Sequence, residues 1–410
     1  NLQPQTSSYN AGGVCNWILP KYGFLQQILL TYTKSVTQAQ GLAADGSTNV
    51  EIPYGDIFNV IDRIEFLSSS RVISTLYAED LMAQFSDLSN DQLEPIYNTA
   101  LKNHVGPPGA AGAGSATATY VVPIVFGFNR DINTVQNLSF NEPTSLRVVW
   151  RGGGGSIVST RGAAPVAAAI VSPGIVRTIS DASIMLRYKL YSEADNAELL
   201  TQNYNEPQLN QLTSRFMREN PFQDAVMAGL PASVGLHTAR IVLRNVDVIK
   251  AFYIMVRAEV NDTAAGDGPT NTSPNDLLDI TSITLTASGQ ELCSMNFAQN
   301  YYSRLTENGH AIQGNTTGTI ASLPTSNGST ILTRPMSLAG IYKIQTGLWE
   351  NAGGGAWSNG WSARELNNLL LEVTFAKPLN RICTCFVEQE TATILSTSSN
   401  TGRVVNSLVN

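Results

Sequence analysis

The sequence predicts an all-β protein with two antiparallel β-sandwich domains in tandem, interrupted by short helical insertions. Three observations indicate this class. Strand-sized segments follow one another without the regular strand–helix alternation that parallel sheets require. Charged residues make up only 14% of the 410-residue chain, which leaves a surface of uncharged polar residues. A pattern of a long strand and a hairpin in the first half also returns in the second half.

The repeated pattern is clearest in the hairpins. Residues 57–77 are predicted to form two short strands joined by a serine turn, because apolar residues alternate along them. Residues 276–296 repeat the pattern 219 positions later, so that Ile283 takes the place of Ile64. Two copies of one sandwich, fused in tandem, therefore account for the length of the chain.

The first half is expected to hold an extended N-terminal arm at residues 1–20, which leaves the domain, and the first sandwich at residues 21–191. After the hairpin the apolar residues change to helical spacing, which predicts two short helices. Glu79 and Asp80 fall in the first helix and are expected to face solvent. Residues 106–119 are dominated by Gly, Ala and Pro, which predicts an exposed loop before the next strand.

Residues 192–235 are interpreted as a helical connector between the halves. The interpretation depends on partial helical spacing of the apolar residues Leu209, Leu212, Phe216 and Met217. The second sandwich is expected at residues 236–395, without a clear pair of helices after its hairpin. Residues 396–410 are predicted to form a polar C-terminal tail.

The charge distribution argues against direct binding of nucleic acid. The net charge is −7 and no run of Lys or Arg occurs, whereas nucleic-acid affinity comes from neutralised phosphates. No apolar window reaches the roughly 18–20 residues that a membrane span needs.

No set of residues in the sequence forms a recognisable active site, so we expect no enzyme, no catalytic residues and no cofactor. Four consecutive glycines at 152–155 lack the Lys-Ser/Thr that a phosphate-binding loop requires. Three loop carboxylates could collect calcium, but their spacing matches no known calcium loop: these are Asp262, Asp267 and Asp276.

Histidines and cysteines give no metal signature either, because they are few and scattered. They are His104, His237, His310, Cys15, Cys293, Cys383 and Cys385. Alternation places Cys383 and Cys385 on one strand face, where buried thiols are expected. Trp357 and Trp361 lie in a glycine loop that could form a sugar platform or a plug at a subunit contact.

The order of the elements resembles that of the double jelly-roll major capsid proteins of tailless icosahedral double-stranded DNA viruses, the lineage of adenovirus hexon. The resemblance covers nearly the whole chain and is carried by LLTYTKSVTQ with DRIEFLSSSRVIS, and by IMVRAEVN with TSITLTASGQELC. It implies two eight-stranded jelly rolls side by side, and a homotrimer that forms a pseudo-hexagonal capsomer. No short diagnostic motif is present.

The resemblance further implies a place in the virion shell among neighbouring capsomers, after assembly in the host cytoplasm. It also implies contacts with minor capsid, penton or spike proteins and with an underlying viral membrane. Two alternatives stay open at the level of the sequence. One is a non-enzymatic β-sandwich adhesin or carbohydrate-binding surface protein, and the other is a hydrolase built from two jelly rolls.

Overall fold

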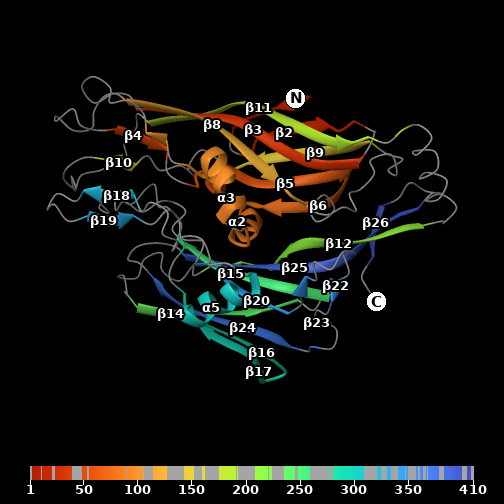
Figure 1. Ribbon diagram of the computed structural model, residues 1–410, viewed down its shortest axis with the longest axis vertical. Helices are drawn as coiled ribbons and strands as arrows, with labels where there is room; N and C mark the ends of the chain where they lie inside the picture. Colours follow the sequence, from red (N-terminus) through yellow and green to blue (C-terminus); the bar gives the residue numbers. More distant parts are fainter. Residues whose placement is uncertain are drawn as a thin grey trace.

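The computed structural model shows two β-rich halves stacked along the longest axis of the molecule (Figure 1). The N-terminal half, coloured red to yellow, lies above the C-terminal half, coloured green to blue. The structure describes residues 2–10, 12–20, 24–38, 49–52, 55–88, 90–102, 104–105, 114–126, 143–151, 159–161, 175–190, 192, 208–219, 221–223, 235–244, 248–258, 277, 280–308, 321–324, 330–333, 340–346, 348–349, 357–358, 361–362, 366, 368–377, 383–398 and 404–407.

The first half is a sandwich of two antiparallel sheets, as predicted. Their strand orders are β1-β2-β9-β5-β6 and β11-β3-β8. The strands are β1 (Thr6–Ser7), β2 (Val14–Ile18), β3 (Phe24–Gln38), β5 (Ile61–Ser68), β6 (Arg71–Tyr77), β8 (Gly114–Ile124), β9 (Thr144–Trp150) and β11 (Ile175–Lys189). A smaller sheet pairs β10 (Ser159–Arg161), β4 (Asn49–Ile52) and β7 (His104–Val105).

The second half has the same architecture. Its two main sheets have the orders β12-β25-β15-β20 and β14-β24-β16-β17. These strands are β12 (Gln208–Arg218), β14 (Gly235–Val242), β15 (Val248–Ala258), β16 (Ile280–Ala287), β17 (Gln290–Asn296), β20 (Tyr342–Gln345), β24 (Leu369–Lys377) and β25 (Cys383–Ser398). Short strands add to them or pair with each other: β13 (Phe222–Gln223), β18 (Ala321–Pro324), β19 (Thr330–Thr333), β21 (Leu348–Trp349), β22 (Trp357–Ser358), β23 (Trp361–Ser362) and β26 (Val404–Ser407).

The two halves repeat one strand plan, which confirms the predicted duplication. The orders β2-β9-β5-β6 and β14-β24-β16-β17 correspond strand for strand, and so do β11-β3-β8 and β25-β15-β20. The hairpin strands β16 and β17 begin and end 219 positions after β5 and β6. Both hairpins also have a register shift at the same place, after Phe66 and after Leu285.

The turn of each hairpin repeats as well. Ser69 has a φ of 52° and Ser288, which lies 219 positions later, has a φ of 49°. Both residues therefore adopt the left-handed conformation that an L-residue seldom takes outside tight turns. The repeat thus extends to the backbone of the first turn residue, whereas the second differs, because Gly289 has a φ of 80° and Ser70 has no positive φ.

The helices are short and lie directly before or after the hairpins. They are α1 (Ile57–Val60), α2 (Ala78–Ser86), α3 (Asn90–Ile96), the π-helix η1 (Tyr97–Leu101) and α5 (Phe297–Asn308). The first hairpin strand thus begins at Ile61 and not at Ile57, because residues 57–60 form a helical turn. Helix α5 starts 219 positions after α2, although the sequence predicted no clear helix pair there; the described residues hold no counterpart of α3. Within the described part of the chain, no helix is long and apolar enough to cross a membrane.

The prediction that residues 1–20 form an arm leaving the domain is wrong. Strand β2 pairs with β9, and the side chains of Cys15 and Trp17 are fully buried. Leu2 exchanges backbone hydrogen bonds with Ile184 of β11 at 2.8 and 3.1 Å, at the edge where the second half has β12 beside β25. Alternation of buried and half-buried residues in VCNWI explains the docking of this segment onto the first sandwich.

Three further segments also differ from their predicted structure. The predicted helical connector contains β12, which pairs along its whole length with β25, so this part is not helical. The predicted loop at 106–119 ends early, because β8 starts at Gly114 and buries Ala116 and Ala118 by alternation. In the predicted tail, β25 runs on to Ser398 and β26 pairs with it. The division into domains at the predicted boundaries stays a prediction.

Candidate functional site: the buried seam between the two halves

The contact between the two halves is the most heavily charged buried region of the described chain. Figure 1 shows α2 on the side of the first half that faces β12 and β25 of the second half. Strand β15 is buried on both faces here. Phe252 and Ile254 point into the second core, whereas Tyr253 and Met255 pack in the core of the first half. We call this contact the seam.

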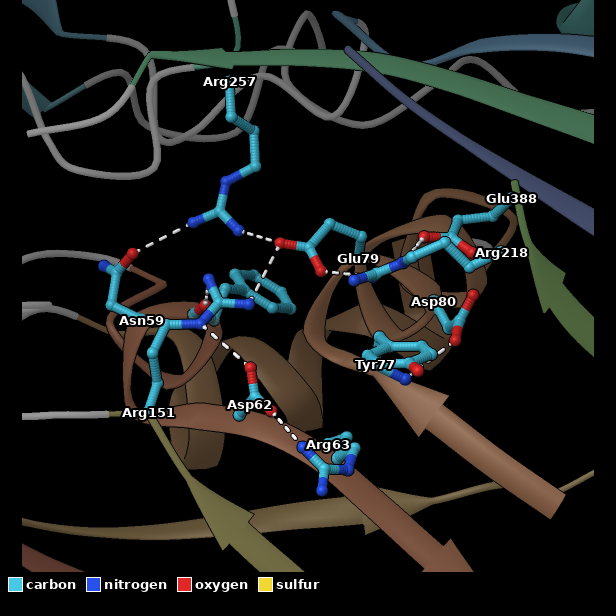
Figure 2. Close-up of polar contacts among 11 residues, drawn as sticks. Asn59, Asp62, Arg63, Tyr77, Glu79, Asp80, Arg151, Arg218, Arg257 and Glu388 are labelled. Atoms are coloured by element: carbon cyan, nitrogen blue, oxygen red, sulfur yellow. Dashed lines mark hydrogen bonds and ion pairs between the residues drawn. The ribbon is translucent and has the colours of Figure 1, made fainter. Parts of the chain in front are cut away.

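Glu79 lies at the centre of the seam, in the first turn of α2, and is fully buried. Its Oε2 accepts a hydrogen bond from Arg218 Nη2 at 2.5 Å, and its Oε1 accepts from Arg257 Nη1 and, at 3.4 Å, from Arg151 Nη2. Arg257 also donates to Oδ1 of Asn59 at 3.0 Å (Figure 2). One carboxylate therefore joins arginines of β12 and β15 to the first half.

The charges around Glu79 keep it ionised. Burial alone would raise the pKa of Glu79, but the positive charges of Arg257, Arg218 and Arg151 outweigh it and lower the pKa to about 2. A buried ion pair adds little net stability over apolar packing, but breaking one leaves an uncompensated charge away from water. The cluster therefore fixes how the halves dock more than it raises the free energy of unfolding.

Asp80, the next residue of α2, lies beside Glu388 of β25 (Figure 2). Asp80 Oδ2 accepts a hydrogen bond from the backbone N–H of Tyr77 at 2.7 Å. Glu388 Oε1 accepts from Arg218 Nε at 2.6 Å, and the guanidinium of Arg218 lies 3.7 Å from the centre of the Tyr77 ring. Burial raises the pKa of Asp80 to about 6, although the charge of Arg218 opposes this shift.

A second ionic cluster lies just after α2, around Asp87. Its Oδ1 accepts from Arg304 of α5 at 2.7 Å, and its Oδ2 accepts from Lys343 of β20 at 3.0 Å and from the hydroxyl of Tyr253 at 2.5 Å. Arg304 is fully buried and also donates to the backbone oxygen of Ser86 at 3.0 Å. Burial would raise the pKa of Asp87, but the charges of Lys343 and Arg304 prevail and lower it to about 2.

The seam is arranged to hold the two halves together. The charged groups bond to one another, and the described residues contain no group of His, Cys, Asp and Glu that could hold a metal ion. The glycines at 152–155, the loop carboxylates Asp262, Asp267 and Asp276, and His310 lie outside the described residues.

The remaining residues singled out from the sequence do not come together. His104 packs edge-on against Tyr120 in the first half, whereas His237 lies near Phe375 in the second. Cys383 and Cys385 are both buried, as predicted. Trp361 is partly buried and packs against the core of the second half, and both roles suggested for its loop stay predictions.

Sequence reasoning missed the seam and placed Glu79 and Asp80 in solvent, which is wrong. Both side chains are buried, because the face of α2 that carries them is covered by the second half. The arginine partners of Glu79 lie 72, 139 and 178 positions away, so no local spacing signals the pairing. The one signal available was the placement of two adjacent acids on an otherwise apolar helix in a charge-poor chain.

Comparison with known proteins shows which solved structures have a similar fold. No family model and no curated protein sequence matches this chain. Solved structures do match. A chain of the PBCV-1 virus capsid has a TM-score of 0.59 at 11% identity, and the match covers 100% of this chain and 96% of that one. The mavirus major capsid protein gives 0.58 at 11% identity with coverage of 99% and 89%, and that of Faustovirus gives 0.54 at 10% identity with coverage of 96% and 89%.

The chain has the double jelly-roll fold. The matches extend over both halves, and each half contains the two facing antiparallel sheets that define a jelly roll. In this double jelly-roll, the seam is the contact between the two rolls. At these identities the likeness establishes the fold, and function requires a separate argument.

Proposed function

We propose that this chain is a major capsid protein, of which three copies form a pseudo-hexagonal capsomer that tiles an icosahedral virus shell. The observation that carries the proposal is the extent of the structural likeness, which runs through both rolls to proteins of the PBCV-1, mavirus and Faustovirus capsids. Two fused rolls give each chain two similar blocks, so three chains present six around one axis.

The chemistry of the described residues supports a structural role. The buried acids and bases of the seam bond to each other and hold the rolls in one arrangement, which a tile must keep. The low charge content allows copies to approach closely without strong repulsion. We infer that the protein is not an enzyme and that it resides in the virion, in contact with neighbouring capsomers. Minor capsid, penton or spike proteins and an underlying membrane are further partners that this role would bring.

Light scattering after size-exclusion chromatography tests the proposal directly. The expected particle has three times the 44.1 kDa mass of the chain and keeps this mass on dilution. Negative-stain images should show outlines with near-hexagonal symmetry. A protein that stays monomeric at high concentration contradicts the proposal, and a monomer that binds a glycan array supports the alternative of an adhesin.

A further inference from the structure

Asp80 and Glu388 form a pair of acidic side chains across the seam, one from each roll. Both are buried, and their carboxyl groups lie side by side (Figure 2). An ionised carboxylate can only accept hydrogen bonds, so two ionised groups cannot bond to each other. A proton on one of the two would allow them to do so.

The other contacts of the pair show where this proton lies. The Oδ2 of Asp80 is engaged by the N–H of Tyr77, and the Oε1 of Glu388 is engaged by Arg218. The remaining oxygens, Oδ1 of Asp80 and Oε2 of Glu388, are buried and have no hydrogen-bond partner within the part of the chain that the structure describes. A proton held between these two oxygens satisfies both of them at once.

The charges around the pair are too few to neutralise two carboxylates. Among the described residues, Arg218 of β12 is the one cation that bonds to the pair, and it also bonds to Glu79. Arg257 of β15 and Arg151, which follows β9, direct their guanidinium groups to Glu79 instead. The ring of Tyr77 contributes no full charge. The pair is therefore left with a share of the positive charge of Arg218, and the nearby carboxylate of Glu79 adds a further negative charge.

We propose that Asp80 and Glu388 hold one shared proton, and that its loss loosens the contact between the two rolls. Two ionised carboxylates that lie side by side in the seam would repel each other, and Arg218, which is shared with Glu79, would offset this repulsion only in part. The device belongs to each single chain, so it does not depend on assembly into a shell.

The direction of the pH effect follows from the burial of the pair. Burial, with the neighbouring charge of Asp80, raises the pKa of Glu388 well above its usual range. The folded chain therefore binds this proton more tightly than the unfolded chain does. The stabilisation is complete at acidic pH and is lost as the pH rises through the folded-state pKa.

The variant Glu388→Gln tests the proposal, because its amide offers Asp80 a permanent N–H donor of nearly the same shape. Unfolding equilibria should be measured by denaturant titration from about pH 5 to about pH 9. The folding equilibrium constant of the natural chain should fall by up to about tenfold per pH unit where the proton leaves, since one proton is released. Glu388→Gln should show no such fall. The control Glu372→Gln removes a carboxylate of β24 that pairs with exposed Arg240, and it should follow the natural chain.

Two further measurements locate the effect. Amide hydrogen exchange, corrected for the intrinsic effect of pH, should accelerate in α2 and β25 as the proton is lost, and Glu388→Gln should abolish this acceleration. Infrared spectra of the natural chain at neutral pH should contain the carbonyl band of a buried protonated acid, which Glu388→Gln removes.

Parallel pH curves for the natural chain and Glu388→Gln would overturn the proposal. So would the absence of a protonated-acid band at neutral pH in the natural chain. If Glu388→Gln does not fold, Asp80→Asn replaces it in every measurement, since its amide can donate to Oε2 of Glu388. If the stability of Asp80→Asn depended on pH as steeply as that of the natural chain, the proposal would likewise be contradicted.

Discussion

Glu79 is the residue through which the two rolls are most directly joined. Its carboxylate contacts two arginines of the second roll and one of the first, and none of these contacts is open to water at the acid itself. Without the negative charge, Arg151, Arg218 and Arg257 would face each other with no shared counter-ion. Glu79 therefore joins the two rolls at one point of the seam, as Asp87 does at a second.

Replacement of this acid should be costly. We expect Glu79→Gln to lower the free energy of unfolding by about 3–5 kcal/mol, because it leaves buried arginines uncompensated. Urea denaturation at neutral pH measures this loss. Glu372→Gln, which breaks a largely exposed ion pair with Arg240, should cost less than about 1 kcal/mol. Equal costs for the two variants would show that the seam charge is unimportant.

Acid should weaken the seam through Asp87. Because the pKa of Asp87 is lowered to about 2, its ion pairs stabilise the folded chain above about pH 4 and are lost as the pH falls towards 2. Denaturation midpoints measured from about pH 5 to about pH 2 should therefore fall more steeply for the natural chain than for Asp87→Asn. An unchanged slope in the variant would contradict the assignment. Alkaline loss through Asp80 and Glu388 has the opposite sign, so the two effects are separable.

At the scale of elements, strand β2 shows how tightly the N-terminal segment is held. Trp17 is fully buried while its neighbour Ile18 is 47% exposed, as expected for adjacent residues of a strand with one covered face. We expect Trp17→Ala to destabilise the chain by about 3–5 kcal/mol through the cavity it leaves. The control Ile18→Ala should change stability by about 0.5 kcal/mol or less. Similar small effects of both variants would restore the picture of a free arm.

The hairpin turns offer a second test at this scale. Valine is strained at a positive φ, so Ser69→Val should cost about 1–2 kcal/mol, and Ser288→Val a similar amount. Ser70→Val is the matched control, because Ser70 lies in the same turn without a positive φ and should cost little. Thermal unfolding compares the three. A cost at Ser70 as large as that at Ser69 would mean that the positive φ is not the cause.

Elements that depend on local pattern were predictable, and those that depend on distant partners were not. Both hairpins and α2 follow from alternation or helical spacing within a few residues. Strand β12 did not, since its apolar residues fit partial helical spacing and only pairing with β25 decides its conformation. Helix α5 was missed because its sequence is largely polar, with tyrosines that give no clear apolar stripe.

For the whole molecule, duplication was predictable but the seam was not. Repetition at an offset of 219 positions can be read from the sequence, and the resemblance to double jelly-roll proteins depended on it. The buried acids could not be assigned, because most of their partners come from the other roll and lie 139 to 217 positions away in the sequence. The docking of the two rolls thus depends on contacts between residues that are far apart in the sequence, and no short stretch of sequence reveals them.

The acidic and basic side chains of the seam are unequally divided between the two rolls. Most of its acids come from the first roll, namely Glu79, Asp80 and Asp87, and most of its bases from the second, namely Arg218, Arg257, Arg304 and Lys343. Two copies of the same roll docked in this way would bring acid to acid or base to base. The two sandwiches are therefore no longer interchangeable. Loss of either roll would leave charged side chains of the other roll without their ion-pair partners.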